Sequence, residues 1–166
     1  MKLEKKLMLR VFGASRRGKT QTLNNLIDKL ISDKSYSIYM APMDDPNSDG
    51  DRIAIFEKNK IKVGISTVGD YASYVKKPIE QLIQEECDII IAATRTKQGT
   101  KKVFTQLAKE NGYDNQRFEK NANINKWCNK WPHKGEDFKD RKTEYLNKLN
   151  ETDAQFLFDY IDSLTQ

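Results

Sequence analysis

The sequence predicts a three-layer α/β fold with a mostly parallel sheet, one antiparallel hairpin and C-terminal helices. Three observations support this prediction. An apolar run at residues 7–12 precedes a loop with two glycines, and apolar residues at helical spacing follow that loop. Residues 52–57 and 60–66 alternate apolar and polar side chains on either side of a short turn, and residues 89–93 form a nearly unbroken apolar run. Strands that alternate with helices are typical of a sheet covered by helices on both faces.

The length is that of one ordinary domain, and the composition is more polar than that of an average globular domain. The chain has 166 residues, of which 32% are charged, and it carries seven Phe, seven Tyr and two Trp, which argues against general disorder. No apolar run approaches the roughly 20 residues that a membrane span needs. Cys87 and Cys128 belong to no CxxC pair, which predicts reduced thiols. We expect one cytoplasmic domain over residues 1–166, with residues 125–166 as a C-terminal helical appendage.

The stretch VFGASRRGKTQTL carries the most specific signal. Gly13, four further residues and then Gly18, Lys19 and Thr20 match GxxxxGK[ST] without a mismatch. The run before the loop suits a buried strand. The apolar positions after it recur at helical spacing: Leu23, Leu26, Ile27, Leu30 and Ile31. Strand, glycine loop and helix therefore stand in the order that this motif requires.

In these residues the chain resembles the P-loop NTPases, whose Walker A motif cradles nucleotide phosphates. The resemblance implies a P-loop NTPase fold with ATP and Mg²⁺ as cofactors, GTP being the other candidate. Lys19 would reach the β- and γ-phosphates, and the Thr20 hydroxyl would ligate Mg²⁺. Arg16 and Arg17 point either to solvent or over the phosphates. The loop residues expected to bind the nucleotide are Gly13, Ala14, Ser15, Arg16, Arg17, Gly18, Lys19, Thr20 and Gln21.

A predicted β-hairpin over residues 52–66 determines which carboxylate is expected near the metal. Residues 41–51 are predicted to form an exposed polar loop before it. Its turn is expected at Lys58-Asn59, which would place Ile53 and Ile55 opposite Ile61, Val63 and Ile65. The inserted antiparallel element resembles the GTPase-like branch of the P-loop proteins.

If the second hairpin strand neighbours the strand of residues 7–12, the GTPase pattern DxxG places Ser66 where an aspartate is usual. Asp70 follows one residue after Gly69 and is the nearest carboxylate. It is predicted either to act in catalysis and at the metal or to be the N-cap of the helix that follows. The two roles can coexist.

The run at residues 89–93 predicts a central parallel strand buried on both faces. At its carboxyl end, Arg95 or Lys97 would stabilise charge on a transferred phosphoryl group, with a solvated loop as the alternative.

The remaining segments predict further helices and one weakly patterned strand. A helix over residues 71–86 is expected to break before Pro78, and another ends at Gly112. Residues 117–124 form the weak strand. The tail predicts two helices, the second starting with a capping box at Thr152 and Gln155. Trp127 and Trp131 are expected to pack the late helices on the sheet, with base stacking as the alternative.

The expected function is Mg²⁺-dependent binding and hydrolysis of a nucleoside triphosphate. ATP is favoured because the string nearest to the guanine-reading NKxD motif, at residues 125–128, lacks the aspartate. Two alternatives stay open: a small-molecule or nucleotide kinase with residues 126–142 as a lid, and a nucleotide-gated binding module without hydrolysis. An unidentified acceptor or protein is a further expected partner, whereas a membrane is not. Residues 95–150 carry fourteen basic and seven acidic side chains, and sequence-specific nucleic-acid binding is not expected.

Overall fold

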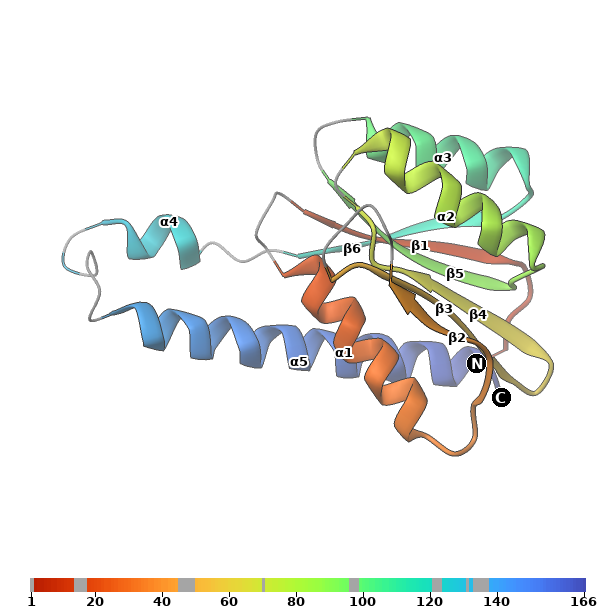
Figure 1. The fold of residues 1–166 in the computed structure, drawn as a ribbon, viewed down its shortest axis with the longest axis horizontal. Helices are drawn as coiled ribbons and strands as arrows, with labels where there is room; N and C mark the ends of the chain where they lie inside the picture. Colours follow the sequence, from red (N-terminus) through yellow and green to blue (C-terminus); the bar gives the residue numbers. More distant parts are fainter. Residues whose placement is uncertain are drawn as a thin grey trace.

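The computed structural model describes residues 2–13, 18–44, 50–69, 71–95, 99–120, 124–130, 132 and 138–166. Within these ranges, six strands form one sheet in the order β2-β3-β4-β5-β1-β6, with helices on both faces (Figure 1). The strands are β1 (Leu7–Gly13), β2 (Ser37–Asp44), β3 (Arg52–Lys58), β4 (Ile61–Ser66), β5 (Ile89–Arg95) and β6 (Asp114–Glu119). The helices are α1 (Lys19–Ser32), α2 (Ala72–Gln84), α3 (Thr100–Glu110), α4 (Ile124–Cys128) and α5 (Lys139–Leu164).

The sheet is mostly parallel, as predicted. β1 pairs in parallel with β5 and β6, and β4 pairs in parallel with β5. Only β3 runs the other way, antiparallel to both β2 and β4. As a consequence, β3 begins at the edge of the sheet where β1, β4 and β5 end. Residues that precede β3 are thereby brought to this carboxyl edge.

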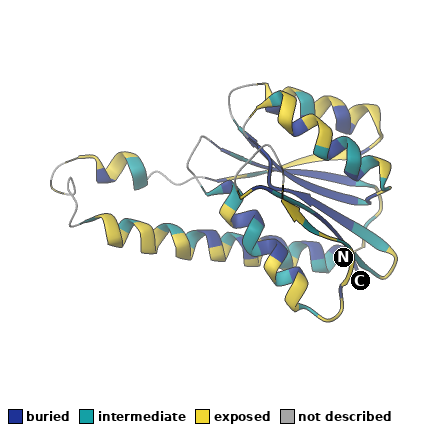
Figure 2. Cartoon of the chain, viewed as in Figure 1, coloured by how far each residue is buried: buried dark blue, intermediate teal, exposed yellow. Residues whose placement is uncertain are grey.

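Two apolar layers lie on either side of the sheet. One joins β1 and β5 to α1 and α5, through side chains such as Leu9 and Ile91. The other joins the same strands to α2 and α3, through side chains such as Met8 and Ile90. The central strands β1, β4 and β5 are accordingly the most buried part of the molecule, whereas the edge strands β2 and β6 are mostly exposed (Figure 2). The chain leaves β1 toward one face and β5 toward the other, and ligands of open α/β sheets bind at such a switch point.

The order of the central strands differs from the expectation that β4 neighbours β1. β5 lies between them, because Ile89–Ala93 are buried on both faces and such a strand fits the centre of a sheet.

The hairpin turn also lies one residue later than expected, at Asn59 and Lys60, which have φ of 52° and 66°. Ile53 pairs with Ser66 and Ile55 with Gly64, so these two isoleucines do not lie opposite Ile61, Val63 and Ile65, and the expected facing is wrong. Side chains alternate between the two faces of a sheet, so Ile55 lies in the apolar layer with α2 whereas Ile65 lies in the layer with α1.

Two expected helix boundaries are absent from the structure. α2 continues through Pro78, and its stripe of Val75, Ile79 and Leu82 is buried on both sides of the proline. The tail is one helix rather than two, because residues 139–164 contain neither glycine nor proline. Gln155 donates to Asp159 along this helix instead of closing a capping box.

The first part of α5 extends beyond the sheet together with α4 (Figure 1). The buried side chains of α5 are Asn150, Ala154, Leu157, Ile161 and Leu164, and none lies in residues 139–149. Trp127 on α4 is 46% exposed and contacts Phe138 with ring centroids 5.6 Å apart. The expectation that Trp127 packs on the sheet is therefore wrong, and Trp131 is outside the described residues. No helix among the described residues is long and apolar enough to cross a membrane.

Candidate functional site

The loop after β1 is anchored at both ends by described residues. Gly18, the N-cap of α1, has φ of 81°, a left-handed conformation that glycine adopts without strain. Its carbonyl accepts a hydrogen bond from the Thr22 amide at 2.9 Å. Lys19 is buried, and its Nζ donates to the Gly13 carbonyl at 2.8 Å. The lysine side chain thus reaches from the end of the loop to its start.

The other predicted loop residues are only partly accounted for. Ala14, Ser15, Arg16 and Arg17 lie outside the described residues, so their roles stay predictions. Gln21 is exposed, and its side chain donates to Asn25 along α1 rather than turning to the loop.

A buried carboxylate that the sequence interpretation missed lies beside Thr20. Asp51 is 5% exposed, and its Oδ1 accepts from the Thr67 hydroxyl at 2.9 Å and from the Thr20 hydroxyl at 3.4 Å. Thr67 in turn accepts from the Arg52 amide at 2.8 Å, which joins the end of β4 to the start of β3. The predicted exposed loop is therefore wrong at Asp51. A usable signal was present, since an aspartate directly before an antiparallel strand comes to the carboxyl edge.

Thr20 and Asp51 together offer a hydroxyl and a carboxylate, which are the oxygen donors that Mg²⁺ prefers. In nucleotide sites this ion takes most of its ligands from phosphate and water and only one or two from the protein. Among the described residues there is no group of three or more His, Cys, Asp or Glu side chains that could hold a metal. The donor set thus fits a phosphate-bound Mg²⁺ better than a metal held by protein ligands alone.

The predicted residue Asp70 lies outside the described residues, and its catalytic and metal roles stay predictions. The N-cap position of α2 belongs to Tyr71, so the capping role expected for Asp70 is displaced by one residue. Gly69, just before it, lies against β5: a Cβ at this glycine would be 2.7 Å from the Ala93 Cβ.

Arg95 is the last residue of β5 and is in register with Gly13, the first residue of the loop. Its guanidinium lies over the Tyr71 ring, 5.8 Å from the centroid. Its amide donates to the Thr100 hydroxyl at 2.8 Å, which connects the end of β5 to the start of α3. The structure therefore brings this predicted charge to the switch point between β1 and β5.

Two buried hydroxyls lie near the same edge. Ser66 Oγ and Thr94 Oγ1 have no hydrogen-bond partner among the described residues, although both side chains are fully buried. Ser66 ends β4, and Thr94 is in register with Phe12 near the end of β1. A buried hydroxyl without a partner costs about 1–3 kcal/mol, so such groups are typical of places where water or a ligand binds.

A buried polar cluster also joins the loop to α5. A Cβ at Gly18 would lie 2.2 Å from Asn150 Oδ1, so the asparagine packs directly on the glycine. The same oxygen accepts from Lys120 Nζ at 3.0 Å and from the Thr22 hydroxyl at 3.4 Å. Lys120 is fully buried at the end of β6 and forms an ion pair with Asp153. The sequence interpretation did not find this cluster, because its members come from three elements distant in the chain.

No family model, curated protein or solved structure matches this chain. The resemblance to the Walker A pattern therefore stays a prediction from the sequence, and the structure adds the geometry of Lys19, Thr20 and Asp51.

Proposed function

We propose that this chain binds a nucleoside triphosphate with Mg²⁺, ATP in preference to GTP, and hydrolyses the bond between the β- and γ-phosphates. The observation that carries the proposal is the arrangement of Lys19, Thr20 and Asp51 at the switch point of the sheet. A cationic side chain, the positive end of a helix and two metal-binding oxygens are gathered there beside a glycine loop.

Each residue has a distinct part in the proposed reaction. Lys19 exchanges the Gly13 carbonyl for a phosphate oxygen and neutralises part of its charge. Thr20 and Asp51 hold the ion, which supplies electrostatic stabilisation of the phosphates when bound. The Thr67 hydroxyl donates to Asp51 and so fixes the orientation of the carboxylate. Arg95 stabilises the charge that develops as water attacks the γ-phosphorus and the nucleoside diphosphate leaves.

The test measures release of labelled phosphate from γ-labelled ATP and GTP, with and without Mg²⁺. We expect Mg²⁺-dependent release that is faster with ATP. Asp51→Asn should reduce the rate about a hundredfold, because it removes the charge while retaining the shape. The control is Asp28→Asn, an exposed carboxylate on α1, which should leave the rate unchanged. Equal rates for Asp51→Asn and wild type would refute the role of Asp51.

Phosphotransfer to an acceptor is a second candidate function, because a pocket of about 720 Å³ lies between α2, the end of β2 and the start of β3. Arg52 and Val68 line it and directly follow Asp51 and Thr67 in the chain. A pocket of this size accommodates a small organic molecule. Label that passes to an added acceptor faster than to water would favour a kinase. Nucleotide binding without either reaction would favour the non-hydrolysing module.

A further inference from the structure

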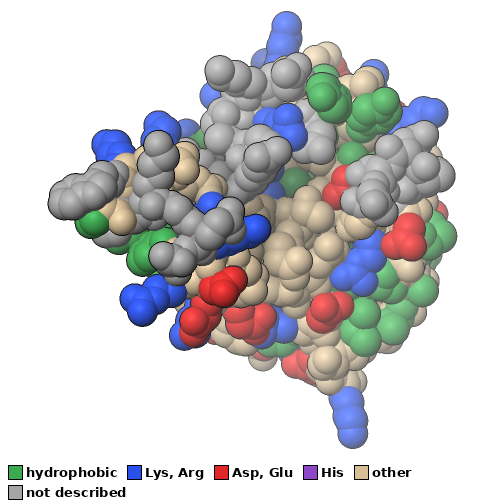
Figure 3. Space-filling view, turned by 60° about the vertical axis from the view of Figure 1, so that its left-hand side comes forward, with side chains coloured by type: hydrophobic (Ala, Val, Ile, Leu, Met, Phe, Trp, Pro, Cys, Tyr) green, Lys and Arg blue, Asp and Glu red, His purple; other side chains and the backbone are tan. Residues whose placement is uncertain are grey.

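The arm, defined here as the described residues 124–130, 132 and 138–149, has no part in the proposed chemistry. It carries an excess of positive charge on both of its helices. Its acidic residues are Asp140 and Glu144, and its basic residues are Lys126, Lys130, Lys139, Arg141, Lys142 and Lys148. Figure 3, which turns the arm toward the viewer, shows Lys and Arg side chains at its surface with hydrophobic side chains nearby.

Much of this charge is not neutralised within the arm. Glu144 pairs with Lys148 at 2.8 Å, so this acid offsets a base on its own helix. Lys126, Lys130 and Arg141 are exposed and form no ion pair with any carboxylate of the described residues. As far as the described part of the chain is concerned, these three cations are therefore available to an external anion.

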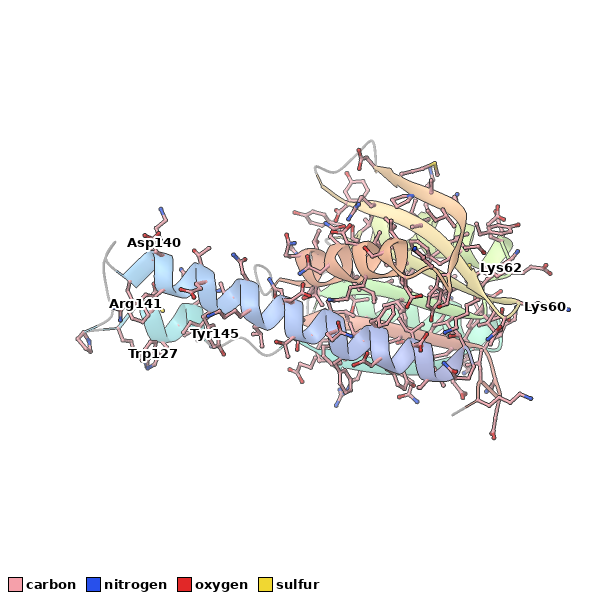
Figure 4. The ribbon with its side chains drawn as sticks, turned by 90° about the horizontal axis from the view of Figure 1, so that it is seen from below. Lys60, Lys62, Trp127, Asp140, Arg141 and Tyr145 are labelled. Carbon is pink, nitrogen blue, oxygen red and sulfur yellow. The ribbon has the colours of Figure 1, made fainter. Side chains whose placement is uncertain are left out.

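Exposed aromatic rings lie among the cations. Trp127 is 46% exposed and Tyr145 is 49% exposed. The rings of Trp127 and Phe138 contact each other edge to face. This contact restricts the orientation of the indole before any ligand binds. Arg141 and Tyr145 are four residues apart on one face of α5, and Figure 4 shows both at the end of the molecule that carries Trp127. Cations interleaved with exposed rings are typical of surfaces that bind unpaired nucleotides.

We propose that the arm binds single-stranded nucleic acid without sequence preference. Lys126, Lys130 and Arg141 contact backbone phosphates, and bases stack on Trp127 and Tyr145. A bilayer fits this surface less well, because its large exposed apolar side chains are two separate rings, Trp127 and Tyr145, rather than a continuous aliphatic face. This inference does not depend on nucleotide hydrolysis, since the arm is distinct from the loop after β1.

The first test measures fluorescence anisotropy of a labelled oligothymidylate of about 20 nucleotides, long enough for several stacked bases. The full chain is used without nucleotide, at about 50 and about 200 mM salt. We expect binding that weakens at the higher salt concentration. The triple variant Lys126→Glu, Lys130→Glu, Arg141→Glu should lose at least about tenfold in affinity. The matched control reverses three exposed lysines outside the arm, Lys60, Lys101 and Lys109, and should stay within about threefold of wild type.

The second test separates stacking from charge. The double variant Trp127→Ala, Tyr145→Ala should also lose about tenfold in affinity, with the salt dependence unchanged because no charge is altered. Trp127→Phe, Tyr145→Phe should retain most of the binding. If the arm and control triple variants lost affinity equally, binding would depend on net charge alone, and the proposal would be overturned. Binding to phosphatidylserine vesicles without binding to the oligonucleotide would also overturn it, in favour of a membrane.

Discussion

At the scale of single residues, Lys19 is the side chain on which phosphate binding depends most directly. Lys19→Ala should weaken ATP binding at least tenfold, or about 1.4 kcal/mol, because it removes a charge-assisted contact from a buried position. Calorimetric titration measures this affinity. Lys34→Ala, an exposed lysine after α1, is the control and should bind as wild type does. Equal affinity for the Lys19 and Lys34 variants would contradict the prediction.

The thiol of Cys87 makes stability depend on pH in the alkaline range. Burial raises its pKa from an ordinary value near 9.0 to about 12. The folded state therefore retains a proton that the unfolded state loses, so stability should be complete below pH 9 and should fall as pH rises toward 12. Urea unfolding at a series of pH values measures this fall. Cys87→Ala removes the thiol and should make the fall less steep than in wild type.

The sequence identified residues of the candidate site only where they belong to one contiguous motif. Lys19 and Thr20 could be identified because the Walker A pattern is local. Asp51 was not separated from the other aspartates of residues 41–51, although its position directly before the first strand of the predicted hairpin was a usable signal. Asn150 and Lys120 gave no signal, since a buried polar pair is recognisable only once the helix is placed against the sheet.

At the scale of elements, the contact between the loop and α5 predicts a severe effect of a small substitution. Gly18→Ala would meet Asn150 at 2.2 Å as well as strain a left-handed residue. We expect a loss of stability well above that of Gly112→Ala, because Gly112 has φ of 74° but open space around it. Chemical denaturation compares the two variants. Adding Asn150→Ala to Gly18→Ala should recover part of the loss, and no recovery would exclude the clash as its cause.

Apolar periodicity predicted some helices and strands correctly and misplaced others. β1, α1, β5 and α3 were predicted because their apolar patterns are strong and their ends are marked. The hairpin was predicted one residue out of place, since the sequence does not fix which two residues adopt the turn. α5 was predicted as two helices because Thr152 and Gln155 match the capping-box pattern of a helix start. The apolar stripe of the helix nevertheless continues past these two residues.

At the scale of the whole molecule, the later part of α5 packs on the sheet, whereas its first part belongs to the arm and extends beyond the sheet. Amides at residues 139–149 should exchange hydrogen much faster than those at residues 154–164, because only the latter part of α5 is buried on the sheet. Exchange followed by mass spectrometry measures both segments in one protein, so each serves as the other's control. Equal protection would show that the arm is stabilised by contacts other than those described.

The overall architecture was predicted as α/β, but the order of its strands was not. Strand order depends on pairings between distant residues, and several orders satisfy the same apolar pattern. The central place of β5 became clear only from its parallel pairing with both β1 and β4.

Asn150 packs directly against Gly18, so a displacement at the end of the loop after β1 would be felt by α5. At the usual rise per residue this helix extends about 16 Å from Asn150 to Lys139. If a displacement of Gly18 tilted α5 by about 10° around Asn150, the end of the arm would move by about 3 Å. The fluorescence of the Trp127 indole would report such a movement.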